Sequence, residues 1–296
     1  MADKAHATTD KQIEAMERKI ATMYRRANKG IVKKADEYFK QFAELDEKKR
    51  KLVDDGKLSE KEYLTWRQNK LMYGKRYEQM QDQIAAELAN VNKTSLAYIN
   101  GELPSTYALH YNAVAEGIEN TADGISFTLT DANTVKRLAT TDKSLLPYKE
   151  LDIPKDKRWN VKKMNAEVLQ GVLQGESMDK IANRMRTVTD MNKVSAIRNA
   201  RTMVTGAENA GRMDMLHEAE SKGIQVEKEW IAAIDARTRH WHAELDGVTV
   251  PIDEPFENEC GKIMFPGDPS ADPANVYNCR CTLGYKVVGF KKNRIG

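Results

Sequence analysis

The sequence predicts an α+β protein that is predominantly α. Apolar residues recur every three or four positions through most of the chain, as on the buried face of a helix. Charged residues make up 31% of the 296 residues and aromatic residues only 7%, which suits long solvated helices with modest cores. The last quarter differs, because it holds all three cysteines and five of the eight prolines. We expect a small C-terminal α+β module with a short hairpin there.

Residues 1–100 are expected to form a long helical hairpin. An apolar stripe runs from Ile13 to Leu45, and the turn residues 54–56 interrupt it. Residues 59–62, Ser-Glu-Lys-Glu, have the pattern of a capping box that opens the second helix of the hairpin. The same stripe fits either packing within the chain or self-association through these helices.

Residues 101–159 are expected to be an irregular linker region, because glycine and proline interrupt them repeatedly. Within the linker, residues 125–130 predict one strand. The helical pattern returns at Asn160 and predicts a series of separate helices up to Ser221. Small residues between Ala196 and Gly211 suit the close approach of another helix.

The net charge does not by itself indicate a partner such as nucleic acid. Forty-seven basic and 44 acidic residues give a net charge of +3, and the two signs are interspersed. No apolar run approaches the roughly 20 residues of a membrane span, and the N-terminus has no signal-peptide core. We therefore expect no membrane partner and synthesis in the cytoplasm. Residues 286–296 are expected to form a basic tail, whose cations could contact DNA phosphates.

The cysteines leave three alternatives open. Zinc is one cofactor hypothesis, because thiolates and imidazoles are its preferred ligands and Cys279 and Cys281 would point to the same side of an extended segment. His242 and Cys260 would complete a set of three cysteines and one histidine. The second alternative is reduced thiols without a metal, and the third is a disulfide between Cys260 and Cys279.

A competing interpretation is a metal-dependent hydrolase that uses His240, His242 and Asp253. Valine stands at position 250, where such a site would need a serine. The structural interpretation assigns other roles to the polar residues of this region. Asp235 would cap a turn and pair with Arg237 or Arg239.

Two further motifs are interpreted as structural. Asp246 and Gly247 precede residues 248–250 and predict a hairpin turn. Arg201 is expected to tie the helical scaffold to an acid of the C-terminal module, such as Asp235 or Asp246.

Residues 160–285 carry an ordered set of motifs. The set comprises Arg201-Thr202, Ala207-Glu208-Asn209, Trp230, Asp235-x-Arg237-Thr-Arg239, His242, Leu245-Asp246-Gly247, the Pro-Gly-Asp-Pro turn at 266–269 and Asn278-Cys279-Arg280-Cys281. In this order they resemble the phage Mu F-like head morphogenesis family. Residues 1–150 lie outside the resemblance.

The resemblance implies a non-enzymatic minor head protein that acts in virion head morphogenesis. It further implies the portal protein and capsid proteins as partners, contact with packaged DNA, and a place in the interior of the phage head. The motif residues expected to serve structure or partner binding are Arg201, Thr202, Trp230, Asp235, Arg237, Asp246, Gly247 and Arg280.

Overall fold

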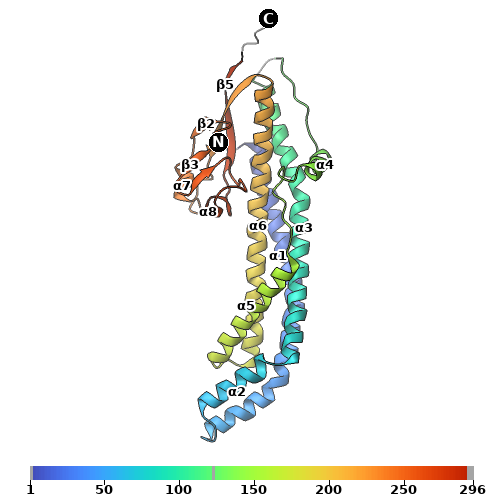
Figure 1. Ribbon diagram of the computed structural model, residues 1–296, viewed down its shortest axis with the longest axis vertical. Coiled ribbons are helices and arrows are strands. Elements are labelled where there is room, and N and C mark those ends of the chain that lie inside the picture. The colour runs from blue at the N-terminus through green and yellow to red at the C-terminus, as the bar shows by residue number, and fades with distance from the viewer. Residues whose placement is uncertain (1–2, 122–123, 292–296) are drawn as a thin grey trace. The chain divides into compact units, whose positions relative to one another are not determined.

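The computed structural model describes residues 3–121 and 124–291, and the chain divides into two compact units. The first unit combines Met1–Glu17, Ala97–Lys149 and Ile197–Gly296, and the second combines Arg18–Leu96 and Glu150–Ala196. Three long helices, α1 (Lys4–Asp54), α3 (Lys75–Glu119) and α6 (Met178–Ser221), contribute residues to both units (Figure 1). No helix in the described part of the chain is both long and apolar enough to cross a membrane.

The second unit is all helical. It contains α2 (Glu60–Met72) and α5 (Ile153–Leu173) besides its parts of the three long helices. The predicted capping box is confirmed, since the Ser59 hydroxyl accepts from the Glu62 amide and the Glu62 carboxylate accepts from the Ser59 amide. The predicted second helix is interrupted between α2 and α3 at Tyr73 and Gly74. Glycine is a poor helix former and Tyr73 is 70% exposed, so no packing holds a helix there.

The first unit contains the predicted C-terminal α+β module. Its antiparallel sheet has the order β2 (Thr249–Pro251), β1 (Ile224–Ile231), β5 (Thr282–Phe290). A separate hairpin joins β3 (Phe256–Asn258) to β4 (Gly261–Ile263). Three short helices, α4 (Ala132–Thr141), α7 (His240–Ala243) and α8 (Pro273–Val276), complete this unit. The α+β class is therefore confirmed.

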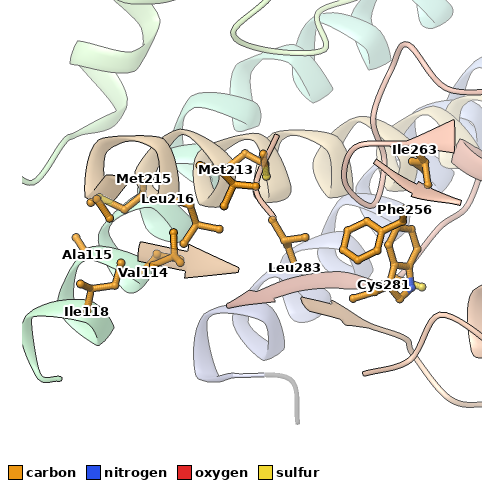
Figure 2. Packing of buried hydrophobic residues seen from close by; sticks show 14 of the residues in the cluster. Val114, Ala115, Ile118, Met213, Met215, Leu216, Phe256, Ile263, Cys281 and Leu283 are labelled. Carbon is orange, nitrogen blue, oxygen red and sulfur yellow. The ribbon is translucent and has the colours of Figure 1, made fainter. Parts of the chain in front are cut away.

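The sheet of the first unit buries one face against helices. Successive residues of β1 alternate between buried and partly exposed, as expected for a strand with one covered face. Figure 2 shows Leu283 of β5 facing Met213 and Leu216 of α6. Trp230 is fully buried in the same apolar cluster. The sheet is thus held on the C-terminal part of α6.

Small residues let neighbouring main chains approach α6 closely, as the sequence predicts. A Cβ atom on Gly211 would lie 2.4 Å from the carbonyl oxygen of Tyr107 in α3. A Cβ atom on Gly206 would lie 2.9 Å from the carbonyl oxygen of Gly267. The two glycines therefore mark where α6 touches α3 and the turn before α8.

The predicted linker at 101–159 is wrong for most of its length. Residues 101–119 continue α3, and Pro104 lies inside this helix. Proline costs about 3 kcal/mol inside a helix, but the buried Leu103 and Tyr107 beside it favour the helical form through packing. Helix α4 was not predicted, and α5 begins at Ile153, before Asn160.

No strand forms at residues 125–130. Side chains of α3 satisfy the main chain of this segment instead. The amide group of Asn112 both accepts from the amide of Thr130 and donates to its carbonyl oxygen, and Glu119 accepts from the amide of Phe127. Because these bonds replace a ladder, the extended segment needs no partner strand.

Two other boundaries differ from the predictions. The separate helices predicted up to Ser221 are one continuous helix, α6. The predicted basic tail begins inside β5, which extends to Phe290 and pairs with β1. Residues 292–296 of that tail lie outside the described residues.

A buried polar cluster joins the start of α1 to α3 and α6 within the first unit. The carboxylate of Glu208, 1% exposed, lies 2.7 Å from Nδ1 of His6. Nε of Arg212 donates to Nδ1 of His110 at 3.0 Å, and Arg212 also pairs with Asp3 at 2.8 Å. The two buried charges therefore have partners, as buried charges require.

This arrangement keeps His110 neutral. Burial lowers its pKa to about 4, and the guanidinium of Arg212 adds to this effect, whereas Glu208 opposes it. The pKa of Glu208 is lowered although burial alone would raise it, because the hydrogen bond to His6 and the charge of Arg212 stabilise the carboxylate. Since Nδ1 of His110 accepts from Arg212, its proton resides on Nε2, which lies 2.7 Å from the Thr9 hydroxyl.

We predict that Gly211→Ala destabilises the protein by roughly 1–3 kcal/mol, because the added Cβ has no room against the Tyr107 carbonyl group. Urea unfolding measures the change. Gly101→Ala is the matched control, since Gly101 is an exposed position of α3 with no atom within 4 Å of the added Cβ. It should be neutral or stabilising by up to about 1 kcal/mol. Equal effects of the two substitutions would contradict the close contact.

We predict that stability falls as the pH drops from about 6.5 towards 4. The unfolded chain takes up a proton on His110 in this range and the folded chain does not, so stability is full above the unfolded pKa of 6.5. The loss should be on the order of 3 kcal/mol. Asp3, His6, Glu208 and Arg212 are the charged or titratable groups around His110.

The variant His110→Gln should flatten this dependence, whatever its effect on absolute stability. The measurement is the slope of the unfolding free energy against pH. His217→Gln is the control, because the His217 side chain is 47% exposed. An unchanged slope in His110→Gln would show that another group is responsible.

Candidate functional site

The segment 278–283, which contains the Asn-Cys-Arg-Cys motif, lies along one stripe of α6. Four polar side chains on α6 hydrogen-bond its main chain and form what we call the α6 ladder, composed of Thr202, Thr205, Asn209 and Arg212. Their spacing of three or four residues places them on one helical face. Side chains of the helix therefore bond the main chain of this segment, whose last two residues also begin β5 and pair with β1.

The ladder satisfies successive main-chain groups. The Thr202 hydroxyl accepts from the amide of Asn278 at 3.1 Å, and the Thr205 hydroxyl donates to the carbonyl oxygen of Cys279 at 2.9 Å. Asn209 accepts from the amide of Leu283 at 2.7 Å. Arg212 donates to the carbonyl oxygen of the same residue at 3.1 Å. The bonds of Cys279 and Leu283 are buried, so each of these avoids a desolvation cost of about 1–3 kcal/mol.

Side chains of the motif point to different surroundings. Asn278 has φ of 57°, a left-handed conformation that asparagine tolerates better than most residues. Arg280 extends to Asp235 and donates from both terminal nitrogens to its two carboxylate oxygens, each at 2.6 Å. Cys279 and Cys281 are both 2% exposed and turn into the module.

The Arg280–Asp235 pair fixes the loop that follows β1. Asp235 also accepts from the amide of Arg237 at 2.8 Å, which forms the predicted turn. The Arg280 guanidinium is the main reason that the pKa of Asp235 lies well below its usual range. Arg237 is only a secondary partner, 3.6 Å from the Asp235 carboxylate.

His242, Cys279 and Cys281 converge in the interior of the module. Nδ1 of His242 lies 3.6 Å from Sγ of Cys279 and 3.6 Å from Sγ of Cys281. The three potential ligand atoms all lie within 4.8 Å of one another. His242 comes from α7 and is 1% exposed, and the cysteines lie just before β5. We call these three residues the Cys-Cys-His cluster.

The neighbours of the cluster determine its orientation and charge. The ring of Trp230 packs edge-on against His242, with the centroids 5.2 Å apart. A hydrogen bond from Cys279 and the proximity of His242 lower the pKa of Cys281 to about 5. The same bond to Cys281, together with burial, raises the pKa of Cys279. Of the two cysteines, Cys281 is therefore the one that favours the thiolate form, and Cys279 favours the thiol form.

Cys260 does not join this cluster. It lies in the turn between β3 and β4, where its amide donates to the side chain of Asn258. The three cysteines are unbonded thiols. The structure thus brings three of the four predicted metal ligands together and leaves the fourth apart.

Arg201 has a different partner from the one predicted. It pairs with Glu17 of α1 and not with Asp235 or Asp246. Asp246 accepts instead from the amide of Ala232 at 2.9 Å. Gly247 has φ of 78° and donates to the carbonyl oxygen of Trp230. Asp246 and Gly247 do form a turn, but it leads into β2 beside β1, and the short hairpin is β3–β4.

The hydrolase interpretation is not supported, because its three residues lie apart. His240 is exposed and pairs with Glu259 at 3.0 Å. Asp253 is also exposed and lies 3.9 Å from His217. Only His242 is buried in the Cys-Cys-His cluster. The spacing of His240, His242 and Asp253 along the chain therefore does not correspond to a shared site.

Sequence reasoning missed most of the α6 ladder and the buried lysine of β1. Thr205, Asn209 and Arg212 recur at helical spacing among alanines, and that pattern indicates a polar stripe that needs a partner. Lys228 is fully buried and donates to the carbonyl oxygen of Ile252, and burial lowers its pKa to about 8. The strand alternation places Lys228 on the same face as Val226 and Trp230, and this was the signal that could have identified it as buried.

Comparisons with known proteins agree with these features. Residues 162–284 match the family described as phage Mu protein F like protein. The chain is 30% identical over 220 residues to minor head protein GP7 of Bacillus phage SPP1, which covers 72% of this chain and 69% of that protein. No solved structure matches.

A second relative matches over a shorter part. The chain is 35% identical over 119 residues to the NAD(+)–arginine ADP-ribosyltransferase EFV of Enterococcus faecalis. The match covers 39% of this chain but only 23% of that protein. The family match and the similarity to GP7 over most of both chains show that this chain belongs to the phage Mu F-like family of minor head proteins.

Proposed function

We propose that this protein is a structural component of the phage head, which associates with the portal protein and the procapsid interior and contacts packaged DNA. The observation that carries the proposal is the similarity to a minor head protein over 72% of this chain. Capsid proteins are the other expected partners. Self-association through the helices of residues 1–100 stays a prediction.

The proposed role is not enzymatic. The transferase that resembles this chain shares 23% of its own length with it, so its named activity belongs to a protein that is mostly outside the match. The buried polar residues of the first unit, above all the α6 ladder and the Glu208 cluster, bond to the chain's own main chain and side chains. Polar groups that bond within the chain support a structural role rather than an enzymatic one.

The DNA contact is supported by a basic face on α5, in the second unit. Four of its basic side chains are exposed, namely Lys155, Lys157, Arg158 and Lys162. No ion pair joins any of the four to an acid within residues 3–121 and 124–291. The one acid among them, Asp156, is turned to Asn92 and Asn160 by hydrogen bonds. The four cations are therefore available to phosphates.

An aromatic ring lies on the same basic face. Trp159 is 39% exposed, and the ammonium group of Lys163 lies 5.5 Å from its ring centroid. Exposed cations next to an aromatic side chain suit a nucleic-acid backbone and its bases. The sequence predicts DNA contacts in the basic tail and gives no signal at this helix. The reason is that basic and acidic residues are nearly equal in number over the whole chain.

We predict that neutralising the α5 basic face weakens DNA binding and reduces its salt dependence. In the variant, Lys155, Lys157, Arg158 and Lys162 are all changed to Gln. Each lost phosphate contact should lower the slope of log K against log salt by about 0.9, and four contacts by up to about 4. Fluorescence anisotropy with duplex DNA at several salt concentrations measures the slope.

The matched control removes four other cations that already pair with acids, three of them exposed and one, Lys193, half-buried. It changes Lys33, Lys51, Lys57 and Lys193 to Gln, since these pair with Glu37, Glu47, Asp55 and Asp190. The net charge changes equally in both variants. Equal slopes for the two would show that overall charge and not the α5 face drives binding.

We predict that the full chain forms a stable complex with the portal protein from the same genome. Co-expression followed by size-exclusion chromatography should yield both proteins in one peak. The variant with the neutralised α5 face should still form this complex, which separates portal binding from DNA binding. Elution in two separate peaks would contradict the portal association, and an unrelated portal protein serves as the control.

A further inference from the structure

The Cys-Cys-His cluster has the dimensions of a metal site. We infer that Nδ1 of His242 and the Sγ atoms of Cys279 and Cys281 hold a zinc ion that closes the C-terminal module. This inference is independent of portal and DNA binding, since it concerns how the module is held together.

The distances support zinc directly. Zinc binds sulfur at about 2.3 Å and imidazole nitrogen at about 2.0 Å, and a tetrahedral angle then separates nitrogen from sulfur by roughly 3.5 Å. Both nitrogen–sulfur distances in the cluster are 3.6 Å. The two nitrogen–sulfur distances therefore match those around a tetrahedral zinc ion, and all three ligand atoms lie within 4.8 Å of one another.

Hydrogen bonding among the three residues leaves them poorly matched without a cation. Nδ1 of His242 faces both sulfur atoms at 3.6 Å, but Cys279 already donates its thiol hydrogen to Cys281, so at most one hydrogen bond joins the nitrogen to the pair. Nε2 of His242 is buried and has no hydrogen-bond partner among the described atoms. The ring's only polar contacts are thus with the two sulfurs. One cation would satisfy the nitrogen and both sulfurs together.

Neighbouring groups orient two of the three proposed ligands. The amide of Ala233 donates a hydrogen bond to the sulfur of Cys281, which orients this sulfur. Trp230 fixes the plane of His242 from the side. No other His, Cys, Asp or Glu in residues 3–121 and 124–291 joins the group, so a water molecule would complete four-fold coordination.

The ion would add a buried link between two segments that the Arg280–Asp235 pair already joins nearer the surface. His242 belongs to the four-residue helix α7, inside the long loop that connects β1 to its antiparallel neighbour β2. Cys279 and Cys281 belong to the segment that is bonded to α6 by the ladder. Zinc would therefore attach the β1–β2 loop to α6 through this segment. Short elements with few large apolar side chains gain most from such a link.

The test measures zinc in the full-length protein purified without chelator. We expect about one zinc per chain in the wild type, none in Cys279→Ser/Cys281→Ser, and unchanged zinc in the matched control Cys260→Ser. Chelator should lower the melting temperature of the wild type and of the control. Zinc-free wild type that stays metal-free after incubation with zinc would overturn the inference, as would loss of zinc in Cys260→Ser.

Cobalt substitution provides a second measurement if the double cysteine variant fails to fold. Cobalt added to metal-free wild type should give thiolate-to-cobalt charge-transfer absorption and the visible bands of a tetrahedral ion. The milder variant His242→Gln should keep the charge-transfer absorption but bind cobalt more weakly. Six-coordinate visible spectra without the charge-transfer absorption would exclude the two cysteines as ligands and refute the site.

Discussion

The C-terminal module depends on one constraint, which is that the main chain of residues 278–283 is buried against a helix. A helix offers no free main-chain groups along its side, so a strand-like segment packed there would lose its hydrogen bonds. The α6 ladder solves this problem with side chains at helical spacing. Gly206 and Gly211 let two other segments, the turn at Gly267 and helix α3 at Tyr107, approach α6 closely.

Once this segment is held, the side chains of the Asn-Cys-Arg-Cys motif have defined positions. Arg280 reaches Asp235 and fixes the loop after β1, while Cys279 and Cys281 face His242. The motif therefore links α6 to the loop between β1 and β2 in two ways. One is an ion pair near the surface, and the other is the buried cluster that we infer to hold zinc.

The two units carry different chemistry. The first unit contains buried polar contacts, and its ionisable groups are mostly paired with each other, as in the cluster around Glu208. The second unit presents unpaired cations on α5 beside Trp159. The exposed cations of α5 are therefore distinct from the charged groups that form the buried pairs of the first unit.

The sequence by itself determined the class of the fold, the capping box at Ser59 and the small-residue face of α6. It also named four candidate metal ligands, without showing which of them meet. These follow from local periodicity and from residue chemistry, which act over a few positions. It did not determine that α3 continues through Pro104, because the packing of Leu103 and Tyr107 decides this. Nor did it give the partner of Arg201, which lies 184 positions away in the sequence.

Only the tertiary structure decided which of the polar residues meet. It brought His242 to Cys279 and Cys281 and left out Cys260, and it separated His240 and Asp253 from that cluster. It also turned the threonines and Asn209 of α6 towards the motif. The physical reason is that these contacts join segments far apart along the chain, and their geometry is set by the burial of the sheet on α6, which no short sequence pattern encodes.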